Sequence, residues 1–424
     1  MTYRDVASRQ VLAWAGTAVG ARMPVAMAPL ALVFLVRERP GGYSLGALLA
    51  AAYVIGEIVG APVLGMRLRP ERARAQLAVG LAVGAAAFAG LGGFPAAPPA
   101  VLAVFACVAG AAPAAATGGL RTLLTALVPE RAAAQALSVE SILTAAVWAV
   151  APAAVAGLAL GVAPGVPLWL AAALMASSVA GLRLLPAAWG MGAGERAEAS
   201  LARVLAGAWP VYITGAASLT LLGLSELVLP ALLEQRGIGV GWSGPLLTGM
   251  AVGGGLGAFL HGLRAWPGRL RTHSVLLMAG TAACVALAAL IPHTAGIAPV
   301  LVLGGMLQSA AMLTRNLALR EVLPPDALAA GYAVMYAAAS AGYAVTGSLA
   351  GALLRVVAPS TAVLAGVGVT LTLSALGWWG EVRRAGRSAR GADRAGAVAG
   401  ARPGARAGAE GTAIRGRGDA ERRL

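Results

Sequence analysis

Long apolar segments recur along the whole chain, and they constrain its fold more than any other feature. A run of about 20 apolar residues is long enough to cross the hydrocarbon core of a bilayer as a helix. Lipid offers the backbone no hydrogen-bonding partner, so such a run must satisfy its own amide groups. We therefore predict an all-α integral membrane protein whose twelve transmembrane helices lie at 11–36, 43–65, 76–94, 99–126, 135–161, 166–186, 208–233, 243–263, 273–291, 297–321, 328–355 and 359–380.

Two arginine-rich turns indicate that the chain consists of two related halves. The stretches Gly60–Arg74 and Gly257–Arg271 match at an offset of 197, with seven of their fifteen positions identical. A second pair of turns, Val128-Pro129-Glu130 and Pro324-Pro325-Asp326, matches at an offset of 196. Two halves in tandem, each with six apolar segments, are typical of secondary transporters.

Changes in composition predict the domain boundaries. We expect an N-terminal six-helix half at 1–189, a polar cytoplasmic linker at 190–207 and a C-terminal six-helix half at 208–380. Residues 381–424 carry eleven arginines among glycine and alanine without apolar periodicity, which predicts a disordered, solvated cytoplasmic tail. Attraction of this basic tail to anionic lipid headgroups is the alternative interpretation.

Arginine bias sets the expected orientation in the membrane, because cytoplasmic loops carry an excess of basic residues. With the N-terminus inside, fourteen arginines lie near the cytoplasmic ends of the helices and four near the outer ends, namely Arg37, Arg39, Arg236 and Arg355. We therefore expect a multi-pass protein of the bacterial plasma membrane, with both termini in the cytoplasm. The first apolar segment is expected to be a retained helix rather than a cleaved signal peptide.

Composition also excludes several classes of function. The chain is 59% hydrophobic and 12% charged, and all 32 basic residues are arginine. Without lysine there is no phosphate-binding loop of the kind that ATP-driven motors use. His261, His273 and His293 are scattered, so we predict no metal site, no cofactor and no enzymatic activity. The excess of basic over acidic residues comes from the loops and the tail, which argues against a nucleic-acid partner. We expect a monomer surrounded by membrane lipid.

This organisation resembles the major facilitator superfamily over about residues 10–380. The turn motif of that superfamily, Gly-x-x-x-Asp-Arg-x-Gly-Arg-Arg, falls on residues 65–74. Gly65 and Arg74 fit it, whereas Arg69 holds the acidic position and Arg72 the second glycine position. The resemblance implies that the two turns gate the cytoplasmic side, with Gly65, Arg67, Arg72, Arg74, Gly262, Arg264, Arg269 and Arg271 as candidate residues.

Three shorter stretches are similar to a bacterial exporter-like branch of the superfamily. They are Arg22-Met23-Pro24 in the first segment, Leu120-Arg121 in the fourth and Ala151-Pro152 in the fifth. Ala151-Pro152 stands where antiporters of this fold carry Gly-Pro. The resemblance implies export by antiport.

Charged side chains inside the predicted helices are the first candidates for a site. A charge near the bilayer centre costs at least about 2.5 kcal/mol, so each should face a partner or a cavity. In the resembled fold the first, fourth, seventh and tenth helices line the central cavity, and each carries one of these charges. The candidates for substrate binding or proton coupling are Arg22, Tyr53, Glu57, Arg121, Glu140, Trp148, Glu226, Gln308, Arg315, Asn316, Tyr336 and Tyr343.

Depth along the helices suggests how these charges pair. Arg121 and Glu140 lie symmetrically about one turn, so they should sit at the same depth on adjacent helices. Arg22 and Glu57 are expected to form a second pair. Each pair is either a structural lock between helices or part of the site that binds substrate.

Polar residues also follow helical spacing. Tyr332, Tyr336 and Tyr343 share one predicted face, and the repeat relates it to the face of Glu140 and Trp148, so both could line one cavity. Glu226 has no obvious partner at its depth. A carboxyl group in an apolar environment binds a proton more readily, so Glu226 is the first candidate for proton coupling, with capping of a kinked helix as the alternative.

The sequence as a whole predicts a proton-coupled secondary transporter that exports small amphipathic organic molecules by alternating access. A cavity of apolar and aromatic residues with a few arginines favours amphipathic and anionic solutes over sugars. The alternatives are an uptake symporter of the same fold, a non-transporting membrane sensor and a lipid-modifying membrane enzyme.

Overall fold

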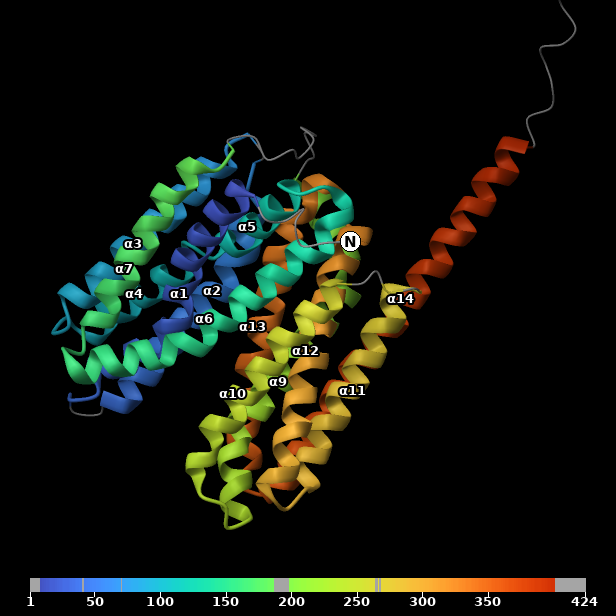
Figure 1. The fold of residues 1–424 in the computed structure, drawn as a ribbon. Helices are drawn as coiled ribbons and strands as arrows, with labels where there is room; N and C mark the ends of the chain where they lie inside the picture. Colours follow the sequence, from blue (N-terminus) through green and yellow to red (C-terminus); the bar gives the residue numbers. More distant parts are fainter. Residues whose placement is uncertain are drawn as a thin grey trace, which may run out of the picture. The chain divides into compact units, whose positions relative to one another are not determined.

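The computed structural model describes residues 8–39, 42–69, 71–186, 198–263, 266 and 268–400, which contain helices and turns but no strand (Figure 1). Within these residues, twelve helices are long and apolar enough to cross a membrane, and they match the predicted segments to within a few residues. The all-α, twelve-helix prediction is therefore confirmed. The α-helices are α1 (Arg9–Val36), α2 (Gly42–Met66), α3 (Ala73–Gly93), α4 (Pro99–Ala111), α5 (Ala115–Ala126), α6 (Ala133–Gly161), α7 (Val166–Gly181), α8 (Glu198–Gly207), α9 (Trp209–Gln235), α10 (Ser243–Leu263), α11 (Leu270–Leu290), α12 (Thr294–Val322), α13 (Leu328–Leu353) and α14 (Pro359–Gly400).

The fourth apolar segment is two helices rather than one. α4 ends at Ala111 and α5 begins at Ala115, with Pro113 between them. Proline has no amide hydrogen and its ring clashes with the preceding turn, so a helix that meets it kinks or breaks. The break packs against α3, where a Cβ added at Gly84 would lie 3.2 Å from the Pro113 ring.

The two halves repeat the same helix pairings, as the duplicated turns predict. In the N-terminal half (α1 to α7), α2 packs on α4 and α1 on α6; in the C-terminal half (α9 to α14), α10 packs on α12 and α9 on α13. Glycines make the first of these pairings close in both halves. In α2, a Cβ added at Gly56 would lie 2.2 Å, and one at Gly60 2.4 Å, from a carbonyl oxygen of α4. In α10, a Cβ added at Gly253 or at Gly257 would lie 2.2 Å from a carbonyl oxygen of α12. These glycines are related by the offset of 197, so the repeat extends to backbone contacts.

Small residues also join one half to the other. α13 packs against α2 and α5, and α6 packs against α10. We call the contact of α13 with α2 and α5 the small-residue seam; it consists of Ala61, Gly65, Ala114, Gly118, Ala329, Ala333 and Ala337. In the contact of α6 with α10, the Ser138 hydroxyl donates to the Ala258 carbonyl at 2.6 Å.

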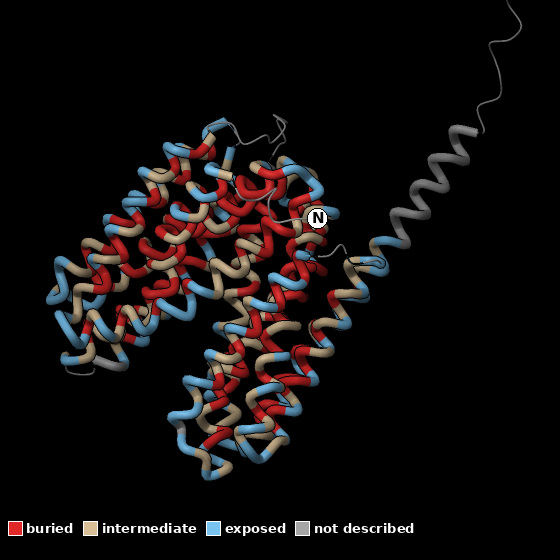
Figure 2. The backbone as a smooth tube through the Cα atoms, in the orientation of Figure 1, coloured by how far each residue is buried: buried red, intermediate tan, exposed pale blue. Residues whose placement is uncertain are grey.

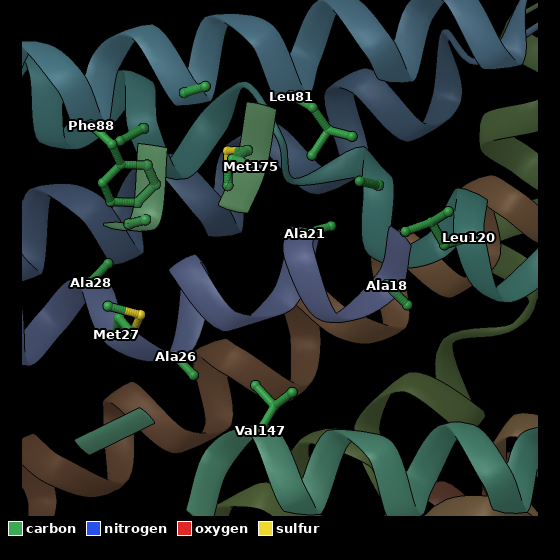
Figure 3. Packing of buried hydrophobic residues seen from close by; sticks show 14 of the residues in the cluster. Ala18, Ala21, Ala26, Met27, Ala28, Leu81, Phe88, Leu120, Val147 and Met175 are labelled. Atoms are coloured by element: carbon green, nitrogen blue, oxygen red, sulfur yellow. The ribbon is translucent and has the colours of Figure 1, made fainter. Parts of the chain in front are cut away.

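The core of the N-terminal half is rich in alanine. Figure 2 shows the buried residues on the inward faces of the helices, and Figure 3 shows Ala18, Ala21, Ala26 and Met27 of α1 among side chains of neighbouring helices. The Trp14 side chain is fully buried in the same cluster, and its indole nitrogen donates to the Leu120 carbonyl at 2.7 Å. Short side chains let the helices approach closely, which is how helices pack where lipid removes the hydrophobic drive between them.

The predicted linker and the predicted tail are described only in part. The first part of the linker, 190–197, lies outside the described residues, and the second part forms the short helix α8. The chain divides into one compact unit, Met1–Trp378, and a second unit that begins at Trp379. The tail that the sequence predicts to be disordered begins within α14, which continues to Gly400. Alanine and arginine have high helix propensity, which favours a helix over this stretch; residues 401–424 are outside the described part.

Candidate functional site

A buried carboxylate, Glu140 on α6, holds two arginines from different helices. The Arg121 Nε atom on α5 lies 2.8 Å from both Glu140 oxygens, and its Nη2 atom lies 2.7 Å from Oε1. The Arg22 Nη2 atom on α1 forms a second ion pair with Oε1. Glu140 is 1% exposed and each arginine 8%. The cluster therefore links three helices of the N-terminal half through charge-assisted hydrogen bonds.

Arg121 also reaches the C-terminal half. Its Nη1 atom donates to Asn316 Oδ1 on α12 at 3.1 Å, and its guanidinium lies 5.3 Å from the centre of the Tyr332 ring on α13. The Tyr332 hydroxyl in turn donates to the Asn316 backbone carbonyl at 3.4 Å. The Arg121 guanidinium thus contacts a carboxylate, an amide oxygen and an aromatic ring.

Arg22 is held less completely. Its Nη1 atom donates to the Thr144 hydroxyl at 2.8 Å, and its guanidinium lies 5.8 Å from the centre of the Trp14 ring. Its Nε atom is buried and has no hydrogen-bond partner among the described residues. Two arginines and one glutamate give the cluster a net charge of +1 (+2 − 1).

A second buried carboxyl group makes a contact between the halves. Tyr336 on α13 donates to Glu57 Oε1 on α2 at 2.6 Å, at the edge of the small-residue seam. Glu57 is 6% exposed. Tyr53, one turn earlier on α2, is also buried, and its ring lies 6.2 Å from that of Phe88. Its hydroxyl has no hydrogen-bond partner in the described ranges.

The third carboxyl group, that of Glu226, accepts a hydrogen bond from its own half. Tyr343, two turns after Tyr336 on α13, donates to Glu226 Oε2 on α9 at 2.9 Å. Both helices belong to the C-terminal half. Neither Glu57 nor Glu226 forms an ion pair within the part of the chain that the structure describes.

The remaining candidates lie around α12 and on the exposed face of α6. Gln308 donates to the Ser218 carbonyl at 2.7 Å, and Arg315 donates to the Thr214 hydroxyl at 3.2 Å. Trp148 on α6 is 50% exposed. Among the described residues, no group of three or more His, Cys, Asp or Glu side chains could hold a metal ion.

The candidates in the two arginine-rich turns also lie among the described residues, except one. Gly65 lies in the seam, where an added Cβ would be 2.6 Å from Ala333. Arg74 donates to the Leu185 carbonyl at 3.4 Å, and Gly262 is buried. Arg264 lies outside the described residues. The other arginines of the two turns, Arg67, Arg72, Arg269 and Arg271, are exposed or half-buried.

Sequence reasoning found most of these residues but not all of their partners. The structure contains the expected Arg121–Glu140 pair, whereas Arg22 contacts Glu140 instead of the expected Glu57. Similar depth is necessary for a contact, but rotation of each helix about its axis decides which neighbour a side chain meets. The three tyrosines of α13, expected to share one face, place their hydroxyls on partners in α12, α2 and α9 respectively.

The overall fold can be compared with known proteins. No protein-family model matches the chain, and no curated protein matches it in sequence. Solved structures do match. The major facilitator superfamily transporter FucP, in the outward conformation, has a TM-score of 0.67 at 14% identity, covering 88% of this chain and 99% of its own.

This chain has the major facilitator fold. The human organic anion transporter MFSD10 has a TM-score of 0.67 at 12% identity, with 90% of this chain and 99% of that chain covered. A bacterial homologue of the iron transporter ferroportin, in the outward-facing state, has a TM-score of 0.68 at 16% identity, with 88% and 97% covered. At these identities the likeness concerns the major facilitator fold, and the roles of single residues depend on the contacts described above.

Proposed function

We propose that the protein is a proton-coupled secondary transporter that exports small amphipathic organic molecules across the plasma membrane of a bacterium. One observation carries the proposal: buried polar groups of the two halves contact each other within the candidate membrane-spanning helices, through Arg121–Asn316 and Glu57–Tyr336. In transporters built from two repeats, the halves rock about a site at this depth.

The contacts between the halves support an interface that can open. The small-residue seam holds α2 and α5 to α13 through alanine and glycine, which bury little side-chain surface per residue. The polar bonds Arg121–Asn316 and Glu57–Tyr336 add to it, and each joins single side chains. Such an interface separates at a low free-energy cost, as alternating access requires.

Proton coupling is supported by the two carboxyl–tyrosine contacts. Burial favours the neutral form of a carboxyl group, and a tyrosine hydroxyl supplies a hydrogen bond but no charge. Glu57 and Glu226 both have this environment. They are the proposed proton-binding groups, whereas Glu140 faces two arginines.

Export, the plasma-membrane location and two cytoplasmic termini rest on the motif resemblance and the arginine bias. Both turns that carry the bias, after α2 and after α10, lie at the same end of the two repeats. The proposed partners are the solute, the coupling proton and the surrounding lipid.

Reconstitution in liposomes that contain a trapped pH-sensitive dye tests this function. With an imposed pH gradient, we expect uptake of an amphipathic test solute to be accompanied by proton movement in the opposite direction. We use naphthalenesulfonate and naphthyltrimethylammonium, which have the same apolar body and fixed opposite charges. Proton movement in the same direction as the solute would instead identify an uptake symporter.

Variants at the Glu57–Tyr336 contact test the coupling step. Glu57→Gln and Tyr336→Phe should uncouple solute flux from proton flux, while exchange of labelled for unlabelled solute continues. Tyr332→Phe is the matched control on the same helix. If the protein moves neither test solute nor protons under any gradient, the transporter proposal is wrong and the sensor interpretation is favoured.

A further inference from the structure

We propose that Arg22 binds the anionic group of an amphipathic substrate, and that Arg121 only holds the site in shape. The inference rests on the proposed transport function and assigns the substrate class of the same site: organic anions with an apolar or aromatic body. It follows from the charge of the cluster, from the unequal bonding of its two arginines and from the surface beside them.

The charge of the cluster calls for an anion. Arg22 and Arg121 share a single carboxylate, which leaves one positive charge uncompensated in a buried setting. An unpaired charge at this depth costs several kcal/mol unless a partner or water solvates it. A bound anion supplies the missing charge, whereas a cationic solute would increase the excess.

The two arginines differ in how many donors they have left. Arg121 places three nitrogen atoms on partners: Nε and Nη2 on Glu140, and Nη1 on Asn316. Arg22 uses Nη1 on Thr144 and Nη2 on Glu140, and its buried Nε atom has no partner within the part of the chain that the structure describes. A planar guanidinium binds a carboxylate or sulfonate by donating two parallel hydrogen bonds. Arg22 is incompletely bonded and is therefore the arginine that can bind an anion.

The surface of α6 offers a place for the apolar body. Glu140, Thr144 and Trp148 follow each other at intervals of four residues, which puts them along one side of the helix. Exposure increases in this order, from 1% at Glu140 through the half-buried Thr144 to 50% at Trp148. An anion that reaches Arg22 along this side brings its apolar part against an exposed indole ring.

This division of roles makes a prediction about the empty protein. Arg22→Gln leaves Glu140 paired with Arg121, and the cluster becomes neutral (+1 − 1). The variant should therefore be as stable as the wild type or more stable when no ligand is bound. A purely structural role for Arg22 gives the opposite result, since removal of a structural partner would lower the unfolding temperature.

Binding to the purified full-length protein tests the proposal. Naphthalenesulfonate and naphthyltrimethylammonium are titrated by calorimetry, and the shift in unfolding temperature is measured in parallel. We expect the wild type to bind the sulfonate at least tenfold more tightly than the ammonium compound. Arg22→Gln should weaken sulfonate binding at least tenfold, which corresponds to about 1.4 kcal/mol.

Two further variants complete the test. Arg22→Lys keeps the charge but loses the two-pronged geometry, so its sulfonate affinity should lie between those of the wild type and Arg22→Gln. Arg37→Gln changes a more exposed arginine just after the end of the same helix and should bind as the wild type does.

Three results would overturn the inference: no sulfonate binding at millimolar concentration, equal affinity for both compounds, or unchanged sulfonate binding in Arg22→Gln. These results differ from a failure of the proposed function. If the protein exports the ammonium compound in liposomes, transport stands and the anion assignment is wrong. If the sulfonate binds through Arg22 but no solute moves, the site stands and transport is wrong.

Discussion

Replacing Glu140 with glutamine tests the charge cluster most directly. Glutamine has nearly the shape of glutamate, so packing changes little and the effect comes from the lost charge. The carboxylate is the partner of two buried arginines. Removing one member of a buried pair costs about 3–5 kcal/mol because it leaves an uncompensated charge. Here two cations lose their counter-ion at once, so we expect a loss at the upper end of that range.

The structure also ranks the other variants of the cluster. Arg121→Gln leaves one pair, Arg22–Glu140, but removes three contacts of Arg121 to Glu140; a loss of about 1–3 kcal/mol is expected. Arg121→Gln combined with Glu140→Gln leaves Arg22 alone, so stability should return only in part. In the triple variant that also carries Arg22→Gln the cluster has no charge, and this variant should recover the wild-type stability, since uncharged replacements of buried ion pairs are often neutral.

Thermal unfolding of the purified protein measures this order. A thiol-reactive fluorophore reports exposure of Cys284, which is buried in the folded protein. Folded yield in membranes is a second readout for variants too unstable to purify. If Glu140→Gln is as stable as the wild type, the cluster does not stabilise the fold through its charges. If the triple variant is no more stable than Glu140→Gln, the three side chains do not act as one unit.

Further predictions concern orientation, coupling and packing. In a cysteine-free background, a cysteine at Pro98 should react with an impermeant reagent from outside the cell and one at Glu71 should not; reversed labelling would refute the arginine-bias argument. Glu226→Gln should abolish uphill transport but keep solute exchange, and normal uphill transport in this variant would remove Glu226 from the coupling step. Gly257→Ala should destabilise the C-terminal half, because the added Cβ would lie 2.2 Å from a carbonyl oxygen of α12, whereas Gly255→Ala has open space and should be tolerated. Equal stability of the two glycine variants would contradict the close approach of α10 and α12.

The sequence predicts the number and position of the helices because both depend on local quantities. A helix that crosses a bilayer needs a certain length of apolar residues, and each run can be read without knowledge of the others. The depth of a charged residue in the membrane also depends only on its position within its own apolar run. For this reason the prediction placed Arg121 and Glu140 beside each other, and the structure contains that pair.

Contacts that depend on helix rotation could not be predicted in the same way. Arg22 and Glu57 have similar depths, but α1 presents Arg22 to α6, and α2 presents Glu57 to α13 of the other half. The packing of small residues sets these rotations, and alanine and glycine are so frequent in this chain that their pattern carries little information. The sequence did not predict that α14 continues to Gly400, because residues 381–400 show no apolar periodicity.

The paired glycine crossings bear on how such a chain diverges over evolutionary time. In both halves the closest approach joins backbone to backbone, at Gly56 and Gly60 and again at Gly253 and Gly257. A backbone contact of this kind depends on glycine at the crossing positions. It does not depend on the chemistry of the surrounding side chains. Most positions are then free to drift, provided that a few remain small. A lineage can keep its architecture in this way while identity to structures of the same fold falls to 12–16%.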